Sequence, residues 1–147
     1  MERHVLNSPK ETAKIAAALA KRVSGGEVVA LYGDLGTGKT TFAQSFAKAL
    51  GLKERVQSPT FILMHEHRLK KKKGPTVFLH ADAYRGDAAQ FRAIGFDEYL
   101  GRPDVVVLVE WAERVEALLP KKRIEVRLRH LGGDRRSMII KGPPRLA

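Results

Sequence analysis

A chain of 147 residues with 44% hydrophobic content is long enough to bury one core, and we expect a single domain over residues 1–147. It has no cysteine, and no apolar run approaches the ~18 residues of a membrane span, so we expect a cytoplasmic protein that makes no membrane contact. Lysine and arginine outnumber aspartate and glutamate by 27 to 16, and this net charge of +11 favours polyanions such as nucleotides, nucleic acid or an acidic protein surface.

The first predicted helix begins at Ser8. The segment Ser8–Glu11 has the form of a capping box with Pro9 at the first helical position. Apolar side chains then recur every four residues until Gly25 and Gly26 end the element, so one face of the helix should lie on a core. Residues 27–32 (E-V-V-A-L-Y) form a short apolar run that is typical of a buried parallel strand, and this strand leads directly into a glycine-rich loop.

That loop, G-D-L-G-T-G-K-T, matches the phosphate-binding pattern G-x-x-x-x-G-K-[ST]. Its glycines let successive backbone N–H groups turn inward around phosphates, and the positive end of the following helix adds to the attraction. We expect Lys39 to contact the β and γ phosphates, Thr40 to ligate Mg²⁺ and Thr41 to reach the α phosphate. The residues expected to bind the nucleotide are Gly33, Asp34, Leu35, Gly36, Thr37, Gly38, Lys39, Thr40 and Thr41.

A predicted helix over residues 40–50 follows the loop, and strand, glycine loop and helix together are the context that the motif requires. The next segments predict two strands of a hairpin, a short helix and a further helical turn, at 61–69, 76–84, 88–94 and 96–100. The tip of this hairpin is Lys70–Pro75, which is basic and turn-like.

The strongest strand prediction is residues 104–111 (D-V-V-V-L-V-E-W), because five consecutive apolar residues end in a carboxylate. Residues 112–119 are weakly helical. Residues 123–131 and 135–141, around turn residues 132–134, predict a second hairpin added to the nucleotide-binding core. The expected fold class is therefore α/β, a P-loop NTPase-like three-layer fold whose mixed sheet has a parallel core and added antiparallel hairpins.

Two carboxylates are candidates for the metal and the chemistry. Mg²⁺ prefers oxygen ligands, so an acid is expected near Thr40 at the end of a neighbouring strand. Glu110 ends the strongest strand, at the sheet edge where open α/β folds bind ligands, and Asp82 could hold Mg²⁺ through water or place the attacking water. The plainer alternative is that each is an ordinary strand-end acid. The N-K-x-D signature of guanine recognition is absent, which favours adenine.

Five segments in order resemble one family: G-D-L-G-T-G-K-T-T-F, V-Q-S-P-T-F, H-A-D-A-Y-R, A-I-G-F-D-E-Y-L and L-V-E-W. Between Ser8 and about Pro120 the chain is similar to TsaE, also known as YjeE, the bacterial ATPase of the tRNA threonylcarbamoyladenosine system. The resemblance implies a weak Mg-dependent ATPase that works with a transferase and its companion subunit, of TsaD and TsaB type, in modifying adenosine 37. The chain itself would not perform the transfer.

The resemblance also implies roles for single residues. Lys39, Asp82 and Glu110 would be catalytic, with Glu110 and Thr40 holding Mg²⁺, and Thr12 matches a threonine that lies close to the nucleotide. A switch-like segment would be formed by Ser58, Pro59 and Thr60. Trp111 follows the metal-binding glutamate as in the family, and it would either pack in the core or face a partner.

Beyond Lys39, Arg85 is the only near candidate for neutralising charge on the γ phosphate, so we expect slow hydrolysis that partner proteins change. Two alternatives come from other functional classes. A small-metabolite P-loop kinase would use Arg85 and Arg92 in a lid over the phosphates. A nucleotide-controlled RNA-binding module would use the basic surface, and the run Lys70–Lys73 is either a tRNA contact or a solvated hairpin tip.

Overall fold

The computed structural model describes residues 1–34, 36–56 and 62–143. Within these residues the strands are β1 (Glu2–Leu6), β2 (Val28–Tyr32), β3 (Met64–Arg68), β4 (Val77–Asp82), β5 (Val105–Glu110), β6 (Ile124–Gly132) and β7 (Arg135–Lys141). The α-helices are α1 (Pro9–Ala20), α2 (Lys39–Ala49) and α3 (Ala88–Ala93). Three short 3₁₀ helices are η1 (Phe96–Glu98), η2 (Ala112–Arg114) and η3 (Glu116–Leu118).

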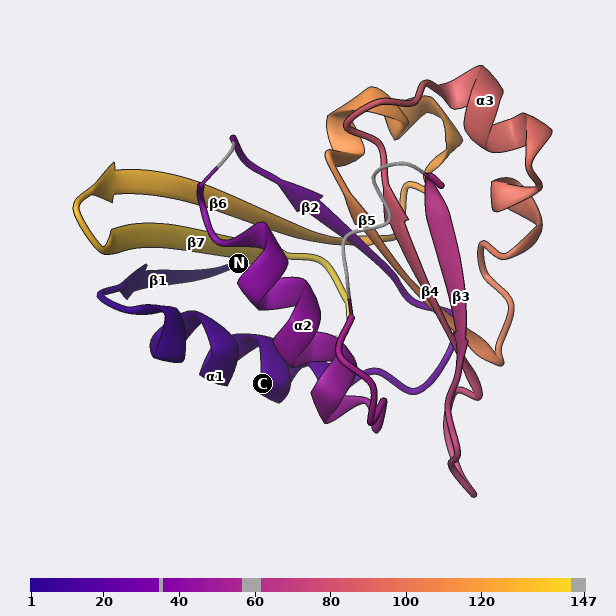
Figure 1. Cartoon of the computed structure of the whole chain (residues 1–147), viewed down its shortest axis with the longest axis horizontal. Helices are drawn as coiled ribbons and strands as arrows, with labels where there is room; N and C mark the ends of the chain where they lie inside the picture. The colour runs from indigo at the N-terminus through magenta and orange to yellow at the C-terminus, as the bar shows by residue number, and fades with distance from the viewer. Residues whose placement is uncertain (35, 57–61, 144–147) are drawn as a thin grey trace.

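All of these strands belong to one sheet in the order β1-β7-β6-β2-β5-β4-β3 (Figure 1). The strands β6, β2, β5 and β4 are parallel, whereas β3, β7 and β1 pair antiparallel with their neighbours. The mixed sheet with a parallel core is therefore confirmed. One refinement concerns the second hairpin, because β6 pairs directly with β2, from Val29 opposite Ile124 to Tyr32 opposite Arg127, and so belongs to the parallel core.

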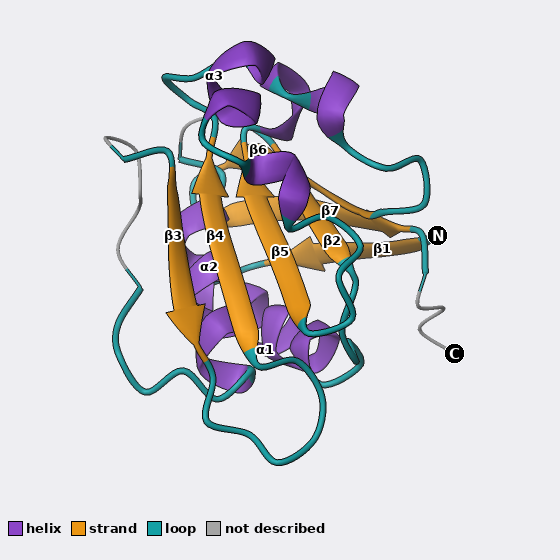
Figure 2. Ribbon diagram, turned by 90° about the vertical axis from the view of Figure 1, so that its right-hand side faces the viewer, coloured by secondary structure: helices purple, strands orange, loops and turns teal. Residues whose placement is uncertain are grey.

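Two apolar layers cover the two faces of the sheet. On one face α1 and α2 pack against the sheet through side chains such as Leu19, Phe42 and Phe46. On the other face α3 and the 3₁₀ helices pack over the β2–β5–β4 part, with Phe91 and Phe96 in that core (Figure 2). Because β2, β4 and β5 are covered on both faces, every residue in them is buried, which explains the apolar runs of β2 and of residues 105–109 in β5.

Several local features differ from the sequence predictions. The sequence does not predict strand β1, since Leu6 is its only fully buried residue and the segment carries no clear apolar pattern. Helix α1 ends at Ala20, five residues before the glycines that were expected to stop it. At its start Ser8 Oγ accepts from the Glu11 N–H at 3.4 Å, but the Glu11 carboxylate accepts from the Asn7 N–H, so the reciprocal bond of a capping box is missing.

The weak helix expected over residues 112–119 consists of the two separate 3₁₀ turns η2 and η3. No helix in the described ranges is long and apolar enough to cross a membrane.

Candidate functional site

The glycine loop begins where the fully buried strand β2 ends and closes where α2 begins. At Gly33, φ is +149°, and an added Cβ would lie 2.6 Å from the Leu128 carbonyl oxygen and 2.8 Å from Thr37 Oγ1, so only glycine fits between the loop and β6. The Thr37 hydroxyl donates to the Asp34 carbonyl at 2.8 Å and ties the loop together from inside. Gly38 caps α2 in a left-handed conformation with φ +101°. The local sequence therefore fixes a tight turn that opens onto a helix N-terminus.

Lys39 is held inside this loop, with only 6% of its surface exposed. Its ammonium donates to the carbonyls of Gly33 and Asp34, the second at 2.7 Å, and Nζ lies 4.2 Å from the ring centroid of Trp111. Burial lowers the pKa of Lys39, and the Glu110 carboxylate is the charge that opposes this lowering most. The loop thus presents a desolvated positive charge, and such a charge attracts an anion more strongly than a solvated one.

Asp82 and Glu110 end the neighbouring strands β4 and β5, and they are cross-strand partners. They are 4% and 3% exposed, and Glu110 also lies opposite Leu31 of β2, one residue before that strand ends. Asp82 Oδ1 accepts from the Tyr84 N–H at 2.9 Å. Both acids therefore stand at the same carboxyl edge as the loop, where the sequence predicts them.

His80 lies beside Glu110, and the sequence does not single it out. Its Nε2 lies 2.7 Å from Glu110 Oε2, and both side chains are almost completely buried. An ionised carboxylate only accepts hydrogen bonds, so this bond to an ionised Glu110 forms in the tautomer of His80 that carries a proton on Nε2. The one available signal is spacing, because His80 stands two residues before Asp82 and alternate residues of a strand share a face.

Trp111 follows Glu110 and adopts a left-handed backbone conformation, with φ +57° and ψ +44°. This conformation costs a non-glycine residue about 1–2 kcal/mol, so the surrounding packing must hold it there. The Trp111 ring packs against Tyr84, with centroids 5.0 Å apart, and against the Lys39 ammonium. Trp111 therefore combines a packing role at the strand end with direct contact to the loop lysine.

The remaining predicted residues divide by position. Thr12 of α1 is buried beside the loop, with its Cγ2 3.9 Å from the place that a Cβ of Gly38 would occupy. Thr40 is exposed and Thr41 is half-buried in the first turn of α2. Arg85 is exposed on the loop that follows Asp82. The predictions for Leu35, Ser58, Pro59 and Thr60 fall outside the described residues.

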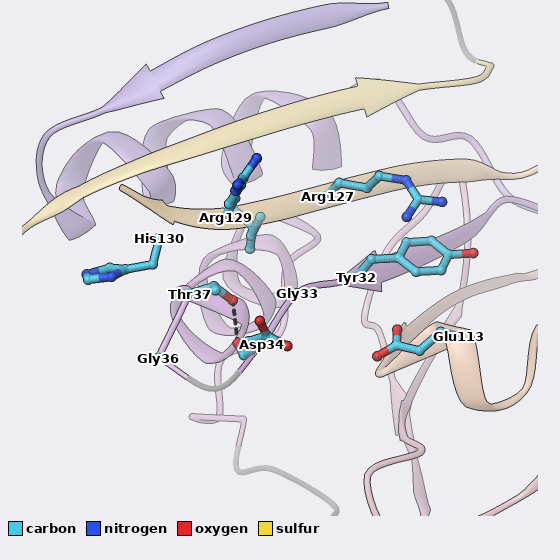
Figure 3. A pocket seen from close by; sticks show the side chains of 10 residues that line it. Tyr32, Gly33, Asp34, Gly36, Thr37, Glu113, Arg127, Arg129 and His130 are labelled. Carbon is cyan, nitrogen blue, oxygen red and sulfur yellow. Dashed lines mark hydrogen bonds between the residues drawn. The ribbon is translucent and has the colours of Figure 1, made fainter. Parts of the chain in front are cut away.

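A pocket of about 680 Å³ opens beside the loop on the β6 side (Figure 3). The loop contributes Gly33, Asp34, Gly36 and Thr37 to its lining, and the rest of the lining is Tyr32, Glu113, Arg127, Leu128, Arg129 and His130. The Arg127 guanidinium stacks 4.1 Å above the centroid of the Tyr32 ring. No local pattern in the sequence could reveal this pocket, because the pairing of β6 with β2 creates it.

Known proteins are similar to this chain in sequence and in fold. The sequence profile of the family described as "Threonylcarbamoyl adenosine biosynthesis protein TsaE" matches residues 6–138, a range that contains the loop, Thr12, Asp82 and Glu110. The chain belongs to the TsaE family. Among TsaE proteins named for tRNA threonylcarbamoyladenosine biosynthesis, the one from Bacillus subtilis is 38% identical over 131 residues, which is 89% of this chain and 79% of that protein.

A second TsaE, from Treponema pallidum, is 33% identical over 139 residues, covering 94% of this chain and 98% of that protein. The crystal structure of Bacillus subtilis YdiB superposes with a TM-score of 0.75 at 35% identity, covering 93% of this chain and 82% of that chain. The TsaE fold of this chain therefore extends over nearly its whole length.

Proposed function

We propose that this chain is the component of the tRNA N6-threonylcarbamoyladenosine machinery that binds and hydrolyses ATP, acting with the transferase complex of TsaD and TsaB type. Membership of the TsaE family supports the biological process. The observation that carries the chemistry is the buried Lys39 ammonium, which is held inside a glycine loop at the same sheet edge as the buried Asp82 and Glu110.

The loop has the features that a triphosphate needs. Gly33, Gly36 and Gly38 have positive φ values, which would let backbone N–H groups of the loop turn inward around phosphates, and the positive dipole end of α2 favours anions. Lys39 already lies in the loop, and its contacts with the Gly33 and Asp34 carbonyls would give way to stronger, charge-assisted bonds with phosphate oxygens. The neighbouring Thr12 would support the nucleotide from α1.

The same edge fits Mg²⁺, because its donors are hard oxygens. Thr40 and Glu110 would hold the ion, and bound Mg²⁺ would neutralise charge on the β and γ phosphates. The His80 hydrogen bond engages Oε2 of Glu110 and so orients the carboxylate for this task.

Asp82 would place the attacking water, since it lies beside Glu110 on the next strand and its buried carboxylate is a hydrogen-bond acceptor. The water oxygen would bond to the γ phosphorus while the bond to the β,γ-bridging oxygen breaks, and the water proton would pass to Asp82 or to the released phosphate. The products are ADP and inorganic phosphate. Arg85, on the exposed loop after Asp82, and groups supplied by the transferase complex would complete the charge neutralisation.

Replacing Lys39 with alanine tests the nucleotide assignment. We expect Lys39→Ala to lose ATP affinity by about tenfold or more and to lose hydrolysis, because one buried charge leaves the loop. Binding of a fluorescent ATP analogue and thermal melting would be measured on the same sample, with Lys72→Ala at the exposed hairpin tip as the matched control. A folded Lys39→Ala protein that binds and hydrolyses ATP like the wild type would refute the assignment.

A further inference from the structure

We propose that one outer face of the β1–β7–β6 part of the sheet docks an acidic protein surface. We call it the open face, and its residues are Arg3, Val5, Arg127, Arg129, Ile139 and Lys141. The expected occupant is the transferase complex, and for this identity the inference rests on the function proposed above.

Strand alternation places these residues on one side of the sheet. Arg3 pairs with Ile139, which pairs with Arg127, and Val5 and Arg129 lie two residues along on β1 and β6. The intervening residues belong to the core on the α1 side, namely Leu6, Val126, Leu128, Met138 and Ile140. Because alternate residues of a strand point to opposite faces, the open face points away from α1.

Nothing in the described ranges covers the open face. On this side of the sheet α3, η1, η2 and η3 pack over β2, β5 and β4, whereas no helix lies over β6, β7 and β1 (Figure 2). Val5 is 57% exposed, and Arg3, Arg127, Arg129 and Lys141 are exposed as well. The helices that cover β2, β5 and β4 on this side therefore leave the β1–β7–β6 part bare.

The open face is strongly positive. Within the described chain, Arg3, Arg129 and Lys141 make no ion pair, and only Arg127 is paired, with Glu125 at 3.2 Å. Glu125 itself is shared with Arg123, at 2.9 Å. Glu125 lies on this face as well, opposite Lys141 in the strand register, and offsets part of the charge. The three basic side chains without an ion pair still make the face positive, which would repel a basic partner and favour an acidic one.

The composition of the face favours a protein over RNA. Its charges are mainly arginines, and they surround an apolar centre of Val5 and Ile139, the mixture found in protein interfaces, where arginine is enriched and lysine is depleted. Sequence-tolerant RNA surfaces instead present aromatic rings for base stacking. The ring of Tyr32, which lies beneath Arg127, is only 5% exposed.

The open face also touches the nucleotide site. Arg127 and Arg129 line the pocket whose other wall includes Gly33, Asp34 and Gly36 of the loop. A protein docked on the open face would therefore reach the outer side of the phosphate-binding loop. A nucleotide bound in the loop could then change the affinity for the docked protein, and the docked protein could change the affinity for the nucleotide. This contiguity gives a physical route by which nucleotide binding and complex formation would be coupled.

Charge reversal on the open face provides the test. The double variant Arg3→Glu with Lys141→Glu would be compared with Lys72→Glu with Lys73→Glu, which makes the same change in net charge at the exposed tip of the β3–β4 hairpin. Affinity for the purified transferase complex would be measured calorimetrically with ATP at several salt concentrations. We expect the open-face variant to bind about tenfold or more weakly with a shallower salt dependence, and the hairpin variant to bind like the wild type.

Fluorescent ATP binding, unchanged in both variants, separates this inference from the nucleotide assignment. Equal affinity of the complex for the open-face variant and the wild type, or equal weakening in both variants, would overturn the docking surface and leave the proposed function intact. A loss of tRNA retention on filters by the open-face variant alone, with affinity for the complex kept, would overturn it in favour of RNA. A wild-type chain that binds ATP but never the complex would overturn both the docking surface and the proposed partnership.

Discussion

The Glu110 carboxylate interacts with two neighbours. Its charge raises the pKa of Lys39 against the effect of burial, and its Oε2 is hydrogen-bonded to His80. Glu110→Gln removes the charge and keeps the shape. We expect Mg²⁺-dependent hydrolysis to fall by about 10²-fold while metal-free nucleotide binding changes little, because the lost group acts on the metal.

A Mg²⁺ titration at fixed ATP would measure this, with metal-free binding of the fluorescent analogue as the internal control. An unchanged Mg²⁺ dependence in Glu110→Gln would return Glu110 to the role of an ordinary strand-end acid.

His80 is expected to act as a positioning residue for that carboxylate. His80→Ala leaves Glu110 buried without this donor, so we expect unfolding to become easier by about 1–3 kcal/mol and more Mg²⁺ to be needed for tight nucleotide binding. His80→Gln places an amide N–H at a similar reach and should restore much of the Mg²⁺ response.

Urea unfolding together with Mg²⁺ titrations of nucleotide affinity would distinguish these outcomes. If His80→Ala lowered stability but left the Mg²⁺ response at the wild-type value, His80 would be a packing residue only.

At the scale of elements, the glycine loop depends on β6 as well as on its own sequence. Gly33→Ala would push a Cβ to within 2.6 Å of the Leu128 carbonyl, whereas Gly74→Ala, also at positive φ, meets open space. Both substitutions should cost about 1–2 kcal/mol in backbone strain, but only Gly33→Ala should lose nucleotide affinity.

Melting curves and ATP binding of the two variants would be compared side by side. Equal nucleotide affinity in both would show that the contact between the loop and β6 does not shape the site.

Elements with strong local signals are predictable from the sequence. The loop, α2 and the ends of β4 and β5 each carry their signal within one segment, and for this reason the sequence alone predicts that Lys39, Asp82 and Glu110 lie at one sheet edge. Strand β1 carries no such signal, because it is short and polar and is held by its pairing with β7.

The rest of the site depends on contacts between distant segments. The His80–Glu110 bond joins residues 30 apart in the sequence, and the pocket needs β6 beside β2. The open face exists only because three strands bring Arg3, Arg129 and Lys141 to one side. Pairing of this kind leaves no periodic trace within a single segment, so sequence patterns could not predict it.

Across the whole molecule, the net charge of +11 is unevenly distributed. One basic region is the lysine run at the tip of the β3–β4 hairpin, and another is the open face at the far end of the sheet (Figure 1). The second adjoins the phosphate-binding loop through the pocket, so it has the better position for linking nucleotide state to assembly.

The function proposed above is that of an ATPase completed by its partners. In related nucleotide hydrolases a charge-neutralising group raises the rate by about 10³ to 10⁵, whether it comes from the same chain or from a partner. The deciding measurement is steady-state ATP hydrolysis by the isolated protein, then with the transferase complex added, with Arg85→Ala assayed in parallel. We predict slow turnover by the isolated chain and a clear change when the complex is added. Fast turnover by the isolated chain, lost in Arg85→Ala and unaltered by the complex, would show a self-sufficient enzyme and contradict it.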